Sequence, residues 1–139
     1  MFSNRLLVTL FVFAVVGLMI NTAASKAAPQ AMAGPTTVSQ AAFPLTVKAG
    51  AYSLLNVVLD FAPGAGVPKH KHGGPVQVTV LEGEITLQQG GTEKTVKAGQ
   101  SWTEQPGQVH AVVNKSSMTT RVLVNILLPK GAAATTLVK

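Results

Sequence analysis

The hydrophobic and polar positions of this chain indicate strands over most of its length. Residues 76–89, VQVTVLEGEITLQQ, alternate in polarity and are rich in valine, a pattern typical of a half-buried strand. Gly90 and Gly91 follow directly and predict a hairpin turn. No window from Phe43 onward has helical spacing, so the pattern predicts an all-β sandwich or barrel. Further segments with strand character, separated by turn signals, are 43–61, 93–99, 109–114 and 119–129.

The N-terminal segment has a different pattern. A largely apolar run over residues 6–20 follows Arg5, and small polar residues follow the run. This order is typical of a secretory signal, with cleavage expected near Ala27, and predicts export to the periplasm or the medium. The alternative is a retained membrane anchor. As a helix the run spans roughly 22 Å, against a hydrocarbon core of about 30 Å, so a cleaved signal is the preferred interpretation.

The pattern divides the chain into four parts. Residues 1–27 form the expected signal peptide, and residues 28–42 are small, uncharged and without periodicity, which indicates a linker or N-terminal arm. Residues 43–130 carry the strand pattern and are long enough for one domain with its own core. Residues 131–139 have no pattern that indicates a partner strand, and we expect a C-terminal tail.

Composition and charge exclude several classes of function. The chain has 11 Lys and Arg against 5 Asp and Glu, but the basic residues are scattered, which argues against nucleic-acid binding. It has no cysteine, so disulfides, zinc–thiolate sites, thiol nucleophiles and an acylated cysteine anchor are all excluded. No serine stands in a nucleophile elbow, and no phosphate-binding glycine loop precedes a helix. The candidate chemistry therefore depends on the histidines.

Two of the 3 histidines stand in a loop rich in glycine and proline, residues 62–77. His70 and His72 are two residues apart, so on extended backbone their side chains face the same side. His110 follows a Pro-Gly turn at the start of another expected strand. Three imidazoles together with an oxygen-bearing side chain, for which Gln77 is the candidate, suit a divalent first-row metal.

This loop resembles the first motif of the cupin superfamily. That motif consists of a glycine, five residues, H-x-H, three or four residues, a glutamate and, about six residues later, another glycine. The corresponding positions in this chain are Gly64, His70, His72, Gln77 and Gly83.

The segment around the third histidine resembles the second cupin motif, which has two glycines, a histidine and an asparagine at a fixed spacing. The proline of that motif is displaced by one residue here, to Pro106. Both motifs occur in order, and the resemblance covers residues 43–129. The residues at the motif positions are Gly99, Gly107, His110 and Asn114.

The resemblance implies a single double-stranded β-helix, or jelly-roll, barrel after the N-terminal signal or anchor helix. It also implies that His70, His72 and His110 ligate one divalent transition metal, which could be Fe, Mn, Ni, Cu or Zn. Gln77 is expected as the fourth ligand, in place of the usual glutamate. A carboxamide cancels none of the metal charge, which makes the metal a stronger Lewis acid, and it cannot serve as a base.

The expected function is that of an exported, metal-dependent enzyme acting on a small organic molecule, as an isomerase, lyase, decarboxylase or dioxygenase. Glu104, in an expected loop over residues 101–108, is the candidate general base, and the alternative is a solvated loop acid. Two other interpretations remain open: a non-catalytic domain that binds a small ligand or a metal, and a cupin without metal. No nucleic-acid partner is expected. Association with a membrane is expected only if the N-terminal segment is retained.

An orientation of the valine-rich strand follows from the assignment of Gln77. If Gln77 points into the barrel, Thr79 and Leu81 do so too, and the three valines of the strand face outward. Exposed valines need cover, which predicts a homodimer, and the alternative is that the arm at residues 28–42 covers them. The three valines are Val76, Val78 and Val80.

Overall fold

The computed structural model describes residues 35–37 and 39–139. The signal or anchor expected at residues 1–27 lies outside this part of the chain, as does most of the expected arm. Residues Thr36–Lys139 form one compact unit. Within the described residues, no helix is long and apolar enough to cross a membrane.

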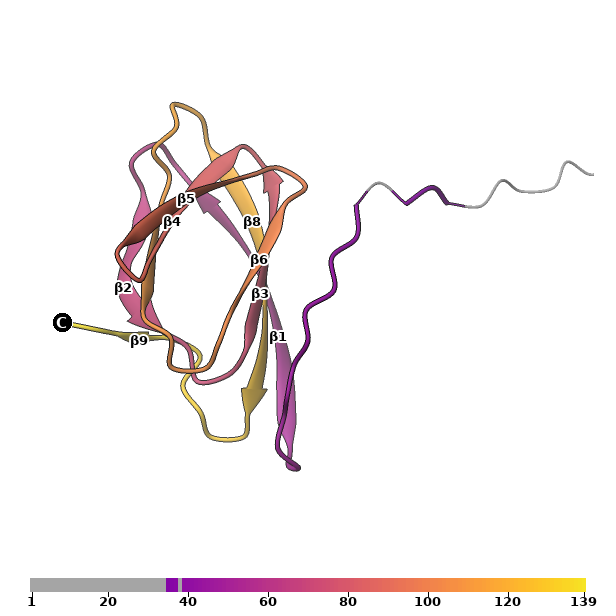
Figure 1. Cartoon of the computed structure of the whole chain (residues 1–139). Coiled ribbons are helices and arrows are strands. Elements are labelled where there is room, and N and C mark those ends of the chain that lie inside the picture. Colours follow the sequence, from indigo (N-terminus) through magenta and orange to yellow (C-terminus); the bar gives the residue numbers. More distant parts are fainter. Residues whose placement is uncertain (1–34, 38) are drawn as a thin grey trace, which may run out of the picture. The chain divides into compact units, whose positions relative to one another are not determined.

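The compact unit is a barrel of two antiparallel sheets that face each other (Figure 1). The first sheet has the order β1-β8-β3-β6 and the second the order β5-β4-β7-β2-β9. An all-β double-stranded β-helix was predicted, and the described strands confirm it. The strands are β1 (Tyr52–Phe61), β2 (Gly66–Lys71), β3 (Val76–Glu82), β4 (Glu84–Gln89), β5 (Thr92–Lys97), β6 (Ser101–Glu104), β7 (His110–Val113), β8 (Thr120–Pro129) and β9 (Thr136–Leu137).

The hydrophobic core lies between the two sheets. Ile85 on β4 and Val96 on β5 pack from the second sheet, and Val122 and Ile126 on β8 pack from the first. Gly90 and Gly91 join β4 to β5 with positive φ angles of 58° and 79°, which confirms the predicted hairpin turn.

The valines of β3 belong to this core, so their predicted outward orientation is wrong. Val76, Val78 and Val80 are between 0% and 4% exposed, whereas Leu81 is 44% exposed. Because side chains alternate along a strand, an error of one position reverses the face of every residue. Burial of three branched apolar side chains in the core fixes the observed orientation. The homodimer prediction thereby loses the observation on which it was based.

Three short elements were not recognised in the sequence. Residues 101–104, expected in a loop, form β6 and pair with β3 from Val76↔Glu104 to Thr79↔Ser101. The loop of the first two histidines contains β2, and the expected tail contains β9, which pairs with β2. β6 and β9 have four residues or fewer, too short for a clear alternating pattern, and the glycines and proline around β2 indicate a loop, so tertiary pairing determines these elements.

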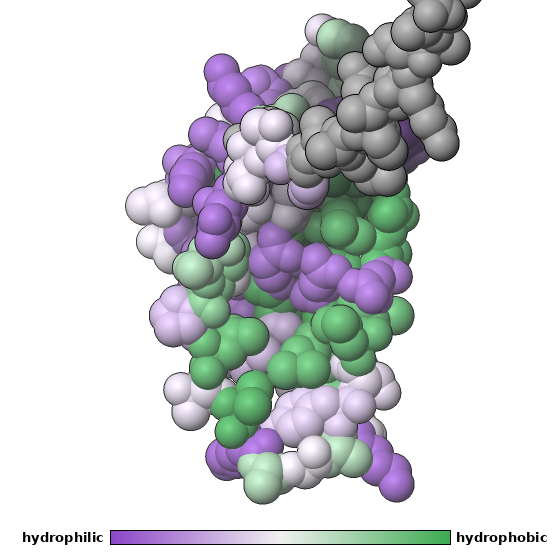
Figure 2. All heavy atoms as spheres, turned by 90° about the vertical axis from the view of Figure 1, so that its right-hand side faces the viewer, coloured by the Kyte–Doolittle hydropathy of each residue, from purple (hydrophilic) through white to green (hydrophobic). Residues whose placement is uncertain are grey.

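The outer face of the first sheet carries exposed apolar side chains on either side of a polar band (Figure 2). Asn56, Asn125 and Gln77 pair side by side across β1, β8 and β3. Leu54 and Val58 on β1 are exposed on either side of this row. The chain before β1 contacts the same sheet, because Phe43 and Leu45 line a groove with Leu54 and Leu127, and the Ser39 hydroxyl donates to Gly99 O at 3.2 Å.

Candidate metal centre

The three histidines meet inside the barrel. His70 lies near the end of β2, His72 follows that strand directly, and His110 begins β7, opposite His70. All three side chains are buried, and one ligand nitrogen from each lies within 4.8 Å of the others. The structure therefore brings together the three residues that the sequence selected as metal ligands.

Backbone carbonyls hold each imidazole by the same nitrogen. His70 Nδ1 lies 2.8 Å from Pro68 O, His72 Nδ1 lies 2.6 Å from Ala134 O, and His110 Nδ1 lies 3.1 Å from Gln108 O. A carbonyl oxygen can only accept, so each Nδ1 carries the proton and donates it. A neutral ring in this tautomer presents the lone pair of Nε2, which is the arrangement found in histidines that ligate metals.

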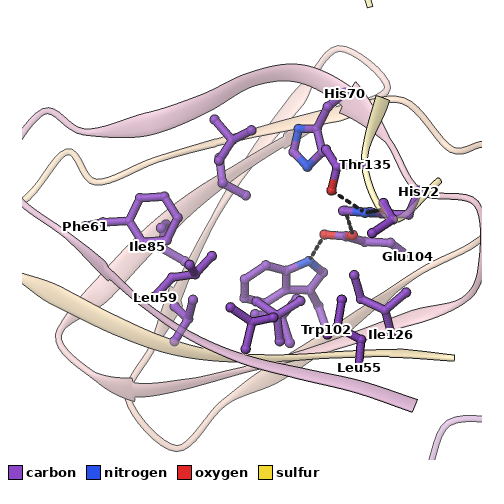
Figure 3. Close-up of a pocket in the computed structure, with 17 residues that line it drawn as sticks. Leu55, Leu59, Phe61, His70, His72, Ile85, Trp102, Glu104, Ile126 and Thr135 are labelled. Carbon is purple, nitrogen blue, oxygen red and sulfur yellow. Dashed lines mark hydrogen bonds and ion pairs between the residues drawn. The ribbon is translucent and has the colours of Figure 1, made fainter. Parts of the chain in front are cut away.

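Glu104 at the end of β6 lies against two of these rings, as Figure 3 shows for His72. Its Oε1 lies 3.0 Å from His110 Nε2, and its Oε2 lies 3.2 Å from His72 Nε2. Trp102 Nε1 donates to Oε1 at 2.8 Å. Oε2 is buried, and its polar neighbour within the described part of the chain is His72 Nε2. The carboxylate is thus held through Oε1 by Trp102, and Oε2 faces the imidazole of His72.

The electrostatic environment keeps Glu104 ionised. Burial alone raises its pKa, but hydrogen bonds from His110 and His72, in the form that carries a proton on Nε2, together with the one from Trp102 outweigh burial and lower the pKa to about 2. Burial opposes the charged form of His72 as well, yet the Glu104 carboxylate raises the pKa of His72. In His70 burial prevails and lowers the pKa. A carboxylate with so low a pKa is a weak general base near neutral pH. Glu104 therefore suits the role of a metal ligand better than that of a base.

Gln77 does not lie with the histidines. Its Oε1 accepts from Asn125 Nδ2 and its Nε2 donates to Thr79 Oγ1, both at 2.6 Å, on the outer face of the first sheet. The expectation that Gln77 points into the barrel is therefore wrong. The cupin motif allows three residues as well as four before its acid, and a spacing of three selects the inward-facing Val76.

The acid beside the histidines thus comes from a neighbouring strand. Glu104 pairs directly with Val76 across β3 and β6. Alternation in the sequence Ser101–Glu104 places Trp102 and Glu104 on one face, and this was the available signal. Sequence reasoning missed the hydrogen bond from Trp102, which lies two residues before Glu104 on the same face of β6. It also missed Ala134, whose contact with His72 joins segments distant in sequence.

The donor set fits a divalent first-row metal. Unprotonated imidazole nitrogens and carboxylate oxygens are all acceptors, so atoms 3.0–3.2 Å apart repel unless a proton or a cation lies between them. Neighbouring ligand atoms on an octahedral ion with bonds of about 2.1 Å are about 3.0 Å apart. Imidazole with carboxylate suits such ions, and the residues that would hold one are His70, His72, His110 and Glu104.

Asn114, at the asparagine of the second motif, has a structural role. Its side chain is fully buried, and Nδ2 donates to Phe61 O at 2.8 Å and to Met118 O at 2.7 Å. Its Oδ1 accepts from the Ser116 backbone at 3.0 Å. The residue therefore fixes the turn after β7 to the end of β1, as the sequence suggested.

A cavity of about 240 Å³ adjoins the histidines between the two sheets (Figure 3). Most of its wall is apolar, and the polar lining residues are His70, His72, Glu104, Thr135 and the indole N–H of Trp102. No lysine or arginine lines it within the described residues. The arrangement can place a small molecule beside the candidate ligands and shield it from water.

Comparison with known proteins places this fold and its motifs in a family. The family model for the cupin domain matches residues 57–126. An uncharacterized conserved protein with a double-stranded β-helix domain from Klebsiella pneumoniae is 27% identical, with a TM-score of 0.55 over 76% of this chain and 90% of that chain. No curated protein matches the sequence.

Two further solved structures are similar to the barrel. The polyketide cyclase RemF from Streptomyces resistomycificus is 25% identical with a TM-score of 0.55, and the match covers 65% of this chain and 63% of RemF. An RmlC-like cupin from Shewanella frigidimarina is 24% identical with a TM-score of 0.50, over 56% of this chain and 68% of that chain. With the family match spanning half of the sequence, this chain belongs to the cupin superfamily.

Proposed function

We propose that this cupin binds one divalent first-row transition metal and uses it to act on a small organic molecule. The observation that carries the proposal is the convergence of His70, His72 and His110 with every Nδ1 held by a backbone carbonyl. Such second contacts fix both the tautomer and the ring orientation that metal binding needs. Glu104 replaces Gln77 as the fourth candidate ligand, through the carboxylate that faces His72 and His110.

The surroundings of the ligands support catalysis. When bound, the metal would supply Lewis acidity that polarises an oxygen atom of the substrate. The buried setting of Glu104 and the histidines excludes water, which strengthens every electrostatic interaction at the site. Trp102 keeps the Glu104 carboxylate in one orientation, so the site is organised before substrate arrives. Isomerisation, elimination or decarboxylation are the reaction classes that such a site serves.

A non-catalytic ligand-binding domain is the second candidate, and the apolar cavity wall favours it. The position of Glu104 distinguishes the two, because a barrel that only stores an apolar ligand does not need a buried carboxylate beside three imidazoles. We therefore prefer the enzyme.

Metal analysis tests the proposed centre. The purified protein is stripped with a chelator, reloaded separately with Fe, Mn, Ni, Cu or Zn, desalted and analysed for metal per chain. We expect one ion per chain in the wild type and loss of that ion in His72→Ala. Gln77→Ala is the control, because Gln77 lies on the outer face of the first sheet, away from the histidines, and this variant should retain the ion. A stoichiometric metal in His72→Ala would refute the ligand assignment.

We also propose that the protein is exported, because Arg5 and the apolar run after it have the order of a secretory signal. Expression of the full chain in a bacterial host, followed by cell fractionation and N-terminal sequencing, tests this. A chain that begins after Ala27 in the periplasmic or secreted fraction is expected, whereas an intact chain in the membrane fraction would indicate the anchor.

A further inference from the structure

The cavity beside the histidines is polar at one end and apolar elsewhere. Alternate residues of β1 point into it, from Leu55 through Val57 and Leu59 to Phe61. Apolar side chains of the other strands complete the wall, and the acidic and imidazole groups all lie at the histidine end (Figure 3). A ligand that fills this space must have an apolar body and one polar end.

The charges at the cavity limit what that polar end can be. Glu104 is the one carboxylate among the lining residues, and none of them is a lysine or an arginine. In the metal-free protein, a dianion would meet the Glu104 carboxylate with only the imidazoles of His70 and His72 to balance its charge, and an incompletely paired buried charge is costly. A sugar would lose its hydrogen bonds to water against walls that cannot replace them. Both classes of molecule fit the cavity badly.

The size and the opening of the cavity limit the apolar body. A volume of about 240 Å³ is below the range of roughly 300–1,000 Å³ typical of drug-sized ligands, so a single ring or a short branched chain fits. β1 and β9 are edge strands of the two sheets. Leu55 and Leu59 line the cavity and are nevertheless 38% exposed, so the cavity opens along the β1 edge.

We infer that the cavity selects compact molecules with an apolar body and one uncharged, oxygen-bearing end, such as a ketone, enol or phenol, and discriminates against dicarboxylates and sugars. The oxygen-bearing end lies against Glu104 and the histidines, and what happens to it there rests on the proposed function. Binding of the apolar body depends on the walls and does not need the metal.

Trp102 provides a readout of binding. It is the only tryptophan of the chain, and its indole lines the cavity. Cyclohexanone and malonate, a neutral cyclic ketone and a dicarboxylate, are titrated into metal-free and metal-loaded protein while tryptophan fluorescence is recorded. We expect cyclohexanone to bind both forms, and to bind the metal-free form at least roughly tenfold more tightly than malonate. Equal or tighter binding of malonate by the metal-free form would overturn the inference.

Two variants of β1 locate the binding. Val57→Phe fills the cavity, whereas Val58→Phe places the same side chain on the outer face of the same strand. We expect roughly tenfold weaker cyclohexanone binding in Val57→Phe and none of this loss in Val58→Phe. An unaltered affinity in a folded Val57→Phe would overturn the inference. If Val57→Phe does not fold, Leu55→Arg at the opening replaces it, with Leu54→Arg as its control.

Leu55→Arg adds a cation to the lining, so we expect it to reverse the preference toward malonate, whereas Leu54→Arg should not. No gain in malonate binding by Leu55→Arg would contradict the charge argument. Metal analysis of the same samples separates this inference from the proposed function. Cyclohexanone binding without any metal uptake would refute the metal centre and leave the cavity specificity intact, and metal uptake without cyclohexanone binding would do the reverse.

Discussion

Val76 and Glu104 lie opposite each other where β3 pairs with β6. Val76 stands three residues after His72, where the first cupin motif can place its acid, and its side chain is buried in the core. Glu104 brings a carboxylate to the same end of the barrel from the adjacent strand. The acid beside the histidines thus lies one strand across from the position that the motif gives it, and the histidines stand at their motif positions.

This relationship predicts that a carboxylate introduced at residue 76 can partly replace the carboxylate of Glu104. In Glu104→Gln we expect metal affinity to fall roughly ten- to a hundredfold, because a neutral amide replaces the carboxylate. Adding Val76→Glu to Glu104→Gln should recover part of that affinity, since residue 76 faces the same cluster. Calorimetric titration with Mn²⁺ or Zn²⁺ measures both. Unchanged affinity in Glu104→Gln would remove Glu104 from the ligand set.

Trp102 is expected to act as a positioning residue for Glu104. Trp102→Phe removes the N–H that donates to Glu104 Oε1 at 2.8 Å, so the indole no longer holds the carboxylate in one orientation. We expect a smaller loss of metal affinity than in Glu104→Gln, and an altered visible spectrum of the Co²⁺-loaded protein. Thr103→Val, on the opposite face of β6, should leave the spectrum unchanged. An identical Co²⁺ spectrum in Trp102→Phe would show that the indole has only a packing role.

Metal affinity should fall as the pH falls, because a histidine ligand must be unprotonated. Although burial opposes it, the Glu104 carboxylate raises the pKa of His72 above its ordinary 6.5, so protons compete with the metal from a pH above that value. In Glu104→Gln the carboxylate no longer favours the imidazolium, and the midpoint of the pH dependence should move to lower pH. Calorimetric titrations at a series of pH values measure this midpoint. A midpoint that stays in place or rises would contradict the coupling.

Asn114 is expected to contribute to stability and not to metal binding. Asn114→Ala leaves the carbonyls of Phe61 and Met118 without the amide donor, which should cost about 1–3 kcal/mol in the free energy of unfolding. Lys115→Ala removes an ion pair with Glu93 at the surface and should lower the free energy of unfolding far less, because solvent screens the pair. Urea denaturation measures both. Loss of metal from a folded Asn114→Ala protein would contradict this division of roles.

The sequence predicted the parts of this protein that local patterns encode. Alternation and the glycine pair predicted the β3–β5 region and its hairpin turn, and the H-x-H spacing predicted that His70 and His72 share a face. The motif left a choice of one residue between Val76 and Gln77. The choice of Gln77 reversed the orientation of β3, although burial of the valines would have indicated the correct one.

Contacts between segments that are distant in the chain could not be predicted from the sequence. β9 is two residues long, and the loop before it contributes the carbonyl of Ala134, which holds the ring of His72. Nothing in the composition of the tail indicates that role, because a backbone carbonyl is available from any residue. The sequence did select Glu104 as a candidate base, but its place beside His72 and His110 depends on the pairing of β6 with β3.

The most direct test of the metal centre is a crystal structure of the metal-loaded protein with anomalous diffraction recorded at the absorption edge of the ion. We expect one anomalous peak per chain, within about 2.0–2.2 Å of Nε2 of His70, His72 and His110 and of a Glu104 oxygen. An ion bound to Nδ1 of any of these rings, or located outside the barrel, would contradict the account.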